Sequence, residues 1–436
     1  MLQLFGSGLI SLWLDMAGVH VKPPDALELL ALHSSPGLVL AADPNQAGAN
    51  TVQQYLKQLE ALGLLTANQG VWIQSGPVLL AKNHGTVPLP AASLTKIATS
   101  LAALKTWGSA HQFDTLVGAT GLVKDGVLQG DLIIQGSGDP FFVWEEAIAL
   151  GNSLNQLGIK RVTGNLVIVG NFGMNYKSNP SEAGQLLKLG LNSAIWPPVA
   201  AAQYLRLPLG TPRPQVVISG SVQVATLPFP KQILLLRHRS LPLSEILKEM
   251  NIYSNNEMAE MLAQSLGGAG RVQQQATAAA SVPQSEIQLV NGSGLGVENR
   301  ISPRAACAML MAIQQELLPH HLSLADLFPV AGRDRRGTLE TRRIPTATVV
   351  KTGTLRDVSA LAGVMPTRDR GLVWFALINR GTDVEGFRAR QDQLLQRLLQ
   401  QWRVAPTIPA ALTPNSPSSD RTQLGAASRD QIFHKS

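Results

Sequence analysis

The chain has 436 residues, of which 45% are hydrophobic and 15% charged, so it can fold into two or three domains with substantial cores. This composition excludes a disordered polymer, and an aromatic content of 5% argues against a nucleic-acid stacking platform. The formal net charge is +7, and its dense part is a run of arginines between 333 and 343, which we interpret as a solvated loop. Cys307 is the only cysteine, which excludes an intrachain disulfide.

The N-terminal residues contain an apolar run, Leu4 to Leu14, that ends at Asp15. No Lys or Arg precedes it, and it is too short to span a bilayer. A degenerate export signal and an ordinary buried segment therefore explain it equally well. Further on, Asn50 and Thr51 are candidate caps of a helix that reaches about Leu64, and the apolar pattern from 71 to 81 predicts one or two strands.

A second helix is predicted from Leu94 to Leu104, where apolar residues recur at helical spacing. From 112 to about 235 the sequence changes to short runs rich in Gly, Val, Ile and Leu, separated by turn residues, with one helical piece at 144–157. Helical periodicity returns from Leu243 to Leu266, in pieces, and Ser302-Pro303 marks the start of another helix.

Three strand-like runs follow, at 347–351, 359–365 and 372–379, and an amphipathic helix at 387–402 comes after them. Pro, Ser, Thr and Asn dominate from Pro406 onward. We therefore predict an α/β (α+β) fold, in which an antiparallel sheet flanked by helices carries a β-rich inserted domain. The predicted boundaries are 1–111 for the first part of the core, 112–238 for the insert, 239–404 for the rest of the core, and 405–436 for a disordered tail.

Ser93 and Lys96 form a Ser-x-x-Lys pattern at the start of the second predicted helix. Residues three apart share a helix face, so the hydroxyl and the amine can approach each other. A buried lysine loses basicity because burial disfavours its charge, and it can then take the proton of a serine nucleophile. Among the 13 lysines, Lys96 alone stands three residues after a serine. A helix cap followed by a surface lysine is the alternative explanation.

Ser254 and Asn256 form a Ser-x-Asn pattern where Tyr-Ser-Asn-Asn interrupts a helical segment. A hydroxyl there could relay a proton, and an amide could hold a substrate backbone. Ser153 and Asn155 match the same pattern. We prefer Ser254, because polar residues that interrupt a helix can face a cleft; the alternative is that they are simple caps.

Lys351, Thr352, Gly353 and Thr354 follow two β-branched residues, which predicts a strand. A glycine in a strand lets another backbone approach closely, so a substrate peptide could pair along this edge. The alternative is a strand that ends in a turn. The order Ser-x-x-Lys, Ser-x-Asn, Lys-Thr-Gly is typical of serine β-lactamases and penicillin-binding proteins.

With these motifs the chain resembles the S13 peptidase family of D-alanyl-D-alanine carboxypeptidase/endopeptidases, the low-molecular-mass class C penicillin-binding proteins. The resemblance runs from about Val78 to Gly381 and includes the long insert between Ser93 and Ser254. Three further stretches carry it: Gly136-Ser137-Gly138-Asp139-Pro140, Asn291-Gly292-Ser293-Gly294-Leu295, and Gly337-Thr338-Leu339. Asn291 stands where the family usually has aspartate.

The resemblance implies a penicillin-binding-protein/serine β-lactamase-like transpeptidase core and a role for each motif residue. Ser93 would attack the carbonyl of the penultimate D-alanine, and Lys96 would accept its proton. Ser254, with Lys351 nearby, would return a proton to the leaving D-alanine. The remaining roles are substrate amide binding by Asn256, carboxylate binding by Thr352 and Thr354 beside Gly353, and an oxyanion hole from the backbone N–H groups of Ser93 and Thr354.

The resemblance also implies peptidoglycan stem peptides as substrates, β-lactams as covalent inhibitors, and no metal or organic cofactor. It places the protein in the periplasm or cell envelope, where the net positive charge could add peripheral association. Nucleic acid is not an expected partner, and no zinc or nucleotide-binding motif is present in the sequence. Two alternatives stay open: a β-lactamase or esterase on the same core, and a non-catalytic envelope binding protein.

Overall fold

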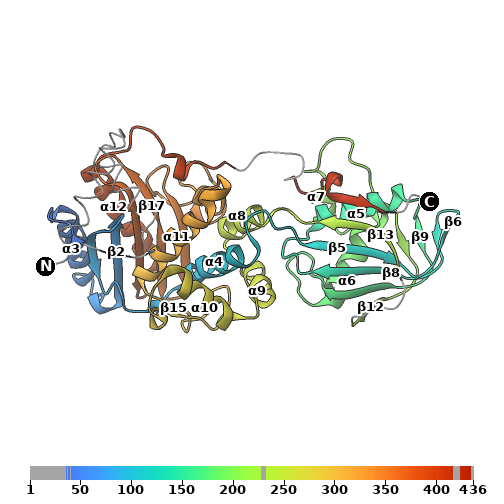
Figure 1. Ribbon diagram of the computed structural model, residues 1–436, viewed down its shortest axis with the longest axis horizontal. Helices are drawn as coiled ribbons and strands as arrows, with labels where there is room; N and C mark the ends of the chain where they lie inside the picture. The colour runs from blue at the N-terminus through green and yellow to red at the C-terminus, as the bar shows by residue number, and fades with distance from the viewer. Residues whose placement is uncertain (1–35, 37, 40, 227–231, 416–422, 434–436) are drawn as a thin grey trace, which may run out of the picture.

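The computed structural model describes residues 36, 38–39, 41–226, 232–415 and 423–433. The apolar run 4–14, interpreted above as an export signal or a buried segment, lies outside them. The described residues form two lobes (Figure 1). The first lobe consists of residues 41–107 and 243–415, and the insert consists of residues 114–239 and 423–433. Within the described residues, no helix combines the length and the apolarity that crossing a membrane requires.

The first lobe is built on a six-stranded sheet in which every neighbouring pair is antiparallel except β1 and β3. In spatial order its strands are β1 (Ala41–Ala42), β3 (Val78–Asn83), β2 (Gln69–Ser75), β18 (Gly371–Arg380), β17 (Val358–Thr367) and β16 (Val349–Leu355). Every residue of β17 is buried, because helices cover both faces of the sheet. The predicted antiparallel sheet flanked by helices is confirmed, and β16 lies at its edge.

Two helical layers cover this sheet (Figure 1). One layer contains α3 (Ala47–Glu60) and α12 (Val384–Trp402); the other contains α11 (Pro303–Leu317), α4 (Thr95–Trp107), α8 (Leu243–Tyr253), α9 (Asn256–Ser265) and α10 (Ala269–Ala280). The helix α3 begins at Ala47, earlier than the caps predicted at Asn50 and Thr51, because the side chain of Asn45 already accepts a hydrogen bond from the Ala47 N–H. The helix α10 was not predicted.

The helix α4 lies at the centre of the second layer, where α8, α9, α10 and α11 all contact it. Every residue from Thr95 to Leu104 is buried, so the helix is enclosed on all sides until its last turn. It therefore holds its N-terminal end, which carries Ser93, in a fixed place. Capping fixes the neighbouring helices as well: the Ser302 hydroxyl accepts from the N–H of Ala305 at the start of α11, with Pro303 in the first position.

The insert contains a second six-stranded sheet and a smaller four-stranded sheet. The larger sheet has the order β12 (Val222–Ala225), β10 (Leu166–Asn171), β8 (Leu132–Ser137), β5 (Asp114–Ala119), β13 (Ile233–Arg239), β19 (Asp430–Ile432); the smaller has β11 (Val217–Ile218), β9 (Arg161–Val162), β7 (Val127–Leu128), β6 (Val123–Lys124). Its helices are α5 (Trp144–Gln156), α6 (Pro180–Gly190) and α7 (Pro198–Tyr204), of which only α5 was predicted. A short sheet in the first lobe joins β14 (Ile287–Gln288), β15 (Arg300–Ile301) and β4 (Leu89–Pro90).

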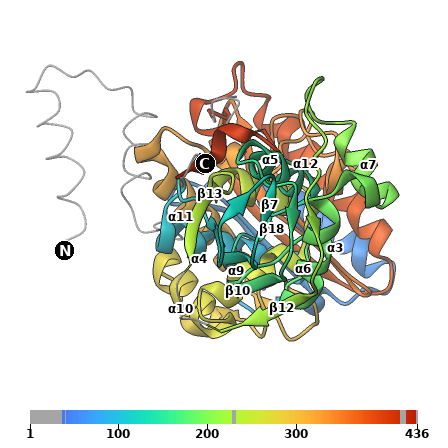
Figure 2. The same cartoon turned by 90° about the vertical axis from the view of Figure 1, so that its right-hand side faces the viewer.

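The described parts of the C-terminal segment, 405–415 and 423–433, correct the prediction of a disordered tail over 405–436, of which residues 416–422 and 434–436 lie outside the described residues. Residues 410–412 form a 3₁₀ turn on the first lobe, and Leu412 is buried there. The last described strand, β19, pairs antiparallel with β13 and so extends the insert sheet (Figure 2). The polar composition misled the prediction, because a few buried anchors such as Leu412 and Arg429 are enough to dock a segment that is otherwise rich in Pro and Ser.

Candidate active site

Ser93 and Lys96 lie at the N-terminal end of α4, Ser93 in a 3₁₀ turn (Ala92–Leu94) and Lys96 in the first turn of the helix. The Lys96 Nζ lies 2.9 Å from the Ser93 Oγ. It also donates to the Asn256 Oδ1 at 2.7 Å and to the Ser293 backbone oxygen at 2.8 Å. Three oxygens from three different elements therefore fix one buried nitrogen against the serine.

Burial makes Lys96 a base at neutral pH. Its side chain has no solvent exposure, and desolvation lowers its pKa to about 7, against the opposing charges of Glu260 and Glu257. An amine with this pKa is largely unprotonated slightly above neutrality, and it can then accept the proton of a hydroxyl within hydrogen-bond reach. The pair can therefore generate a serine nucleophile without a histidine.

Ser254 occupies the break between α8 and α9. Its backbone is left-handed, with φ of 53°, and the next residue, Asn255, caps α9 by accepting from the Met258 N–H. This geometry turns the Ser254 hydroxyl toward Lys351, whose Nζ lies 2.9 Å away. Both interpretations of this break therefore hold: Asn255 is a helix cap, and Ser254 faces the candidate site.

Lys351 is the second buried amine of the site. Its Nζ donates to the Thr352 backbone oxygen at 2.7 Å as well as to Ser254. Burial, helped by the charge of Lys96, lowers the pKa of Lys351 well below its usual range. An amine that is held largely neutral can exchange a proton with a hydroxyl that it contacts, here the hydroxyl of Ser254.

The edge strand β16 lies directly against the turn that carries Ser93. A Cβ built on Gly353 would lie 3.1 Å from the Ser93 backbone nitrogen and 3.0 Å from the Ala91 oxygen. Only a residue without a side chain lets the two backbones approach this closely. Thr354 follows it and is exposed, whereas Thr352 is buried.

Arg388 was missed by sequence reasoning, which gives no signal for it because it is one of several arginines in the last helix. Its Nη2 donates to the Thr354 Oγ1 at 2.8 Å, and its other nitrogen pairs with Glu385, whose side chain is 81% exposed. The Arg388–Glu385 pair lies on the surface and is therefore weak. The Arg388 guanidinium can thus still bind an anion beside Thr354.

The loop Asn291–Leu295 provides the backbone oxygen of Ser293, which accepts a hydrogen bond from the Lys96 Nζ. Glu260 accepts from the backbone N–H groups of Gly292 and Ser293, and the Asn291 Oδ1 accepts from the Gly294 N–H. Gly294 has φ of +86°, and a Cβ there would overlap the Ala92 oxygen. Sequence reasoning noted this stretch only as a resemblance; it did not foresee that the Ser293 carbonyl holds the base.

A cleft of about 430 Å³ opens beside Asn256 and Ser293. Tyr176 and Ser178 of the insert line it, together with residues of α9 and of the loop at Asn291. Its charged lining is the carboxylates Glu257 and Glu260. Both lobes therefore line this cleft, which reaches Asn256 and Ser293, two of the residues that accept hydrogen bonds from Lys96.

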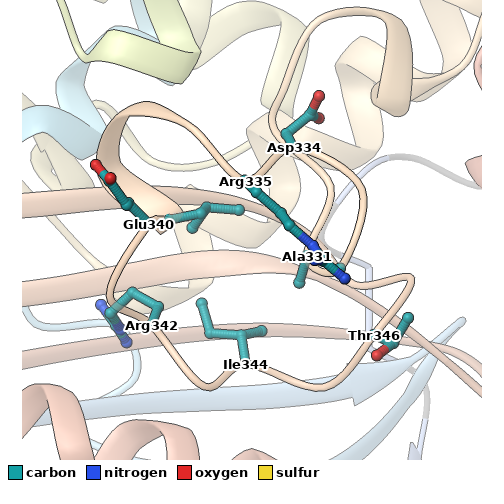
Figure 3. Close-up of a pocket in the computed structure, with 9 residues that line it drawn as sticks. Ala331, Asp334, Arg335, Glu340, Arg342, Ile344 and Thr346 are labelled. Atoms are coloured by element: carbon teal, nitrogen blue, oxygen red, sulfur yellow. The ribbon is translucent and has the colours of Figure 1, made fainter.

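The arginine-rich segment encloses a different cavity, of about 260 Å³ (Figure 3). Its lining mixes Asp334 and Glu340 with Arg335 and Arg342, so it has no single sign of charge. Arg342 is not solvated, in contrast to our interpretation of this run, because it pairs with Asp392 at 2.7 Å. None of the three motifs lines this cavity.

One further sequence candidate, the rival Ser-x-Asn pattern, lies away from this site. Ser153 lies in α5 of the insert, where its hydroxyl donates to Asp430, so the rival Ser-x-Asn pattern is not at this site. In the described part of the chain, no group of three or more His, Cys, Asp or Glu residues is placed to hold a metal ion.

Comparison with known proteins gives consistent matches. The sequence model of the D-Ala-D-Ala carboxypeptidase 3 (S13) family matches residues 49–172 and 211–401. A carboxypeptidase of Mycobacterium tuberculosis is 27% identical over 361 residues, which cover 72% of this chain and 75% of that protein. The D-alanyl-D-alanine carboxypeptidase DacB of Haemophilus influenzae is 23% identical over 389 residues, 67% of this chain and 80% of that protein.

A solved structure shares the fold. It is a penicillin G-acylated predatory endopeptidase from Bdellovibrio bacteriovorus in complex with an immunity protein, with a TM-score of 0.67 at 22% identity. The match covers 78% of this chain and 94% of that one. The fold predicted from the motifs, a penicillin-binding-protein-like core with an added domain, is confirmed.

Proposed function

Since this chain belongs to the S13 family of D-Ala-D-Ala carboxypeptidases, and is thus a serine enzyme that acts on peptidoglycan, we propose that Ser93 is its nucleophile and Lys96 its base. The observation that carries this proposal is the 2.9 Å approach of the Lys96 Nζ to the Ser93 Oγ, with the lysine fully buried. Its lowered pKa supports the same assignment.

In the acylation step, Lys96 takes the Ser93 proton while the Ser93 Oγ bonds to the carbonyl carbon of the penultimate D-alanine. The carbonyl oxygen becomes an oxyanion, for which the backbone N–H groups of Ser93 and Thr354 are the proposed donors, worth about 3 kcal/mol each. The close approach of Gly353 to the Ser93 nitrogen supports that pairing, because it brings the two backbones together.

The C–N bond then breaks, and the leaving nitrogen needs a proton. Ser254 is the proposed donor, and the 2.9 Å contact of its hydroxyl with the Lys351 Nζ supports this role. The proton that Lys96 took from Ser93 then replaces the one that Ser254 gives up, so Lys96 is unprotonated again before the second half of the reaction. Water attacks the acyl-enzyme in the second half of the reaction and releases the shortened peptide, with Lys96 again acting as the base. Lys96 is thus the proposed base in both halves of the reaction.

The substrate peptide is proposed to lie along the edge of β16 beyond Val350, paired to its backbone, since Pro329 and Val330 already pair with the start of this strand. Asn256, which already faces Lys96, would hold the amide on the acyl side. Thr352 and Thr354 would bind the terminal carboxylate, and we add Arg388, because its guanidinium contacts the Thr354 hydroxyl and carries a permanent charge. A carboxylate bound by these three residues would lie next to the scissile bond.

Peptidoglycan lies outside the cytoplasmic membrane, so we propose that the protein works in the periplasm or cell envelope. The net charge of +7 supports an added peripheral attraction to anionic envelope polymers. Fractionation of cells that express the full chain tests this proposal, and recovery of the whole population from the cytosol would contradict it.

β-Lactams are proposed as covalent inhibitors that acylate Ser93, by analogy with the penicillin G-acylated relative. The test is the intact mass of the protein after incubation with penicillin G. We expect an increase of one penicillin mass, lost in Ser93→Ala, with the adduct mapped to the peptide that contains Ser93. An adduct that survives this substitution would overturn the assignment of the nucleophile.

A further inference from the structure

The insert carries an apolar patch on its surface, formed by Val199, Leu205 and Leu209. A surface helix normally presents polar side chains to the solvent. The helix α7 does the reverse, because Val199, Ala201 and Ala202 are its exposed residues beyond Pro198. Leu205, which directly follows the helix, is 78% exposed. The helix lies at the periphery of the insert (Figure 2), so its apolar face meets the solvent.

The turn after α7 holds Leu209 in the solvent. The Thr211 N–H donates to the Pro208 oxygen, and Gly210 between them has φ of 86°. The Tyr204 hydroxyl donates to the Thr211 oxygen at 2.6 Å, which ties the turn to α7. Leu209 is fully exposed at this fixed turn and forgoes the stabilisation that burial would give it. An apolar patch that is held open in this way indicates a partner that covers it.

The charged residues around the patch are basic. From residue 183 to residue 244 the sequence contains no Asp or Glu, but it contains six Lys or Arg. Two of these, Arg206 and Arg213, stand on either side of the turn and are exposed. The neighbouring helix α5 contacts α7, and its carboxylates Glu145 and Glu146 are buried. The patch therefore favours a partner with negative charge.

Two aromatic residues lie beside the patch. The ring centroids of Trp196 and Tyr204 are 5.3 Å apart, and both residues are half-buried. Their polar atoms already have partners within the protein, because the Trp196 Nε1 donates to the Gly190 oxygen and the Tyr204 hydroxyl to the Thr211 oxygen. Half-buried Trp and Tyr are typical of protein surfaces that meet the headgroup region of a bilayer. Apolar side chains, aromatic rings and arginines together are the composition of a surface that binds a membrane interface.

The shared activity of the family does not account for this patch. The S13 family model leaves residues 173–210 unmatched, and Val199, Leu205 and Leu209 all fall in that interval. Among the described residues, those that line the cleft beside Asn256 include none of these three. The patch therefore points to a role outside the shared reaction.

We propose that this patch docks the insert on the surface of a bilayer that contains anionic lipid. The two leucine side chains enter the boundary between headgroups and hydrocarbon, where burial stabilises them. Arg206 and Arg213 lie against lipid phosphates, whose negative charge they complement. The proposal is independent of the proposed function, because lipid binding uses neither Ser93 nor Lys96.

Co-sedimentation with vesicles tests the patch. Vesicles of about three parts phosphatidylcholine to one part phosphatidylglycerol should bind the full chain. The double variant Leu205→Ser/Leu209→Ser should bind them about tenfold more weakly, because two apolar side chains are lost. Leu62→Ser/Leu122→Ser is the matched control: these leucines are 55% and 74% exposed, lie outside the patch, and should be dispensable. Equal thermal melting of the three proteins shows that each is folded.

Vesicles of pure phosphatidylcholine test the role of the lipid charge. Each arginine near an anionic surface strengthens binding about fivefold, so native binding should be about twentyfold weaker on these vesicles. Arg206→Gln/Arg213→Gln should lower binding to the anionic vesicles by a similar factor and leave binding to pure phosphatidylcholine unchanged. Equal native binding to both kinds of vesicle would overturn the role of anionic lipid.

A fluorescent label locates the contact. Cys307 is buried, so Leu209→Cys offers one accessible thiol for an environment-sensitive fluorophore. Its emission should shift to shorter wavelength when anionic vesicles are added, whereas a label on Leu122→Cys should not respond. Equal vesicle binding by the native protein and Leu205→Ser/Leu209→Ser overturns the proposal. A fluorophore that is already shielded without vesicles overturns it as well, because this chain or a second copy would then cover the patch.

Discussion

The Nζ of Lys96 lies 2.9 Å from the Oγ of Ser93, in a position where the lysine has no solvent exposure. The distance alone would also suit a charged lysine that merely donates a hydrogen bond. Burial decides between the two, because desolvation lowers the pKa of this amine to about 7 and makes proton acceptance feasible at neutral pH.

The rate of acylation should therefore depend on pH with a midpoint near 7. Below the midpoint the protonated amine cannot accept a proton, so the rate should rise about tenfold per pH unit before it levels off. Stopped-flow measurement with a fluorescent penicillin gives this profile. A rate that stays flat from pH 5 to 9 would show that Lys96 is not the base.

Glu257 tunes this midpoint, because its negative charge favours the protonated form of Lys96 and raises the pKa against the effect of burial. Glu257→Gln should therefore move the midpoint of the acylation profile to lower pH. Glu60→Gln, an exposed carboxylate on α3, is the matched control and should leave the profile in place. Equal profiles for all three proteins would contradict the electrostatic coupling.

Lys96→Met should lower the acylation rate about 10²- to 10⁴-fold, the usual contribution of a general base. The protein should stay folded, because methionine fills a similar volume and removes a buried amine that is costly to charge. Lys105→Met, on the same helix but in a solvent-exposed pair with Glu316, is the control and should keep full activity. Thermal melting of both variants separates loss of the base from loss of the fold.

Gly294→Ala should destabilise the protein, because the residue has φ of +86° and its Cβ would overlap the oxygen of Ala92, the residue before Ser93. We expect a loss of about 1–3 kcal/mol in the free energy of unfolding, together with slower acylation. Gly270→Ala is the control: it lies in α10 with nothing within 4 Å, and should be neutral or stabilising by up to about 1 kcal/mol. Urea unfolding of both variants compares them, and equal midpoints would refute the steric argument.

Arg388→Ala should raise the KM for a D-Ala-D-Ala peptide about tenfold, since a hydrogen bond to a charged group contributes about 1.5–3 kcal/mol. Arg390→Ala is a matched control on the same helix, because Arg390 pairs with Asp383 instead of Thr354. Steady-state D-alanine release measures both. If the two variants behave alike, Arg388 does not bind the carboxylate.

Much of the core could be predicted from the sequence, because its elements are long and strongly periodic. The strands β17 and β18 and the helix α4 lie close to their predicted positions. The helices α6, α7 and α10 were not predicted. Their sequences are rich in Ala, Gly and Gln or begin at proline, so the apolar pattern is weak and tertiary packing stabilises them.

The candidate site, too, was predicted only in part. The motif residues lie in short sequence patterns, so their types and their order could be recognised in the sequence. The choice between Ser254 and Ser153 was not, since both satisfy Ser-x-Asn, and only the packing of α8 and α9 against α4 brings Ser254 near Lys351. Arg388 and the Ser293 carbonyl reach the site from other parts of the chain, with no local signal.

The sequence by itself determined which atoms are available for chemistry: one serine three residues before a lysine, a hydroxyl and an amide, and a lysine at a strand edge. The tertiary structure decided the state of those atoms and the shape around them. Burial sets the basicity of Lys96, because desolvation depends on everything that surrounds it. The docking of the C-terminal segment also depends on distant partners, and composition alone could not show that Arg429 finds Glu146.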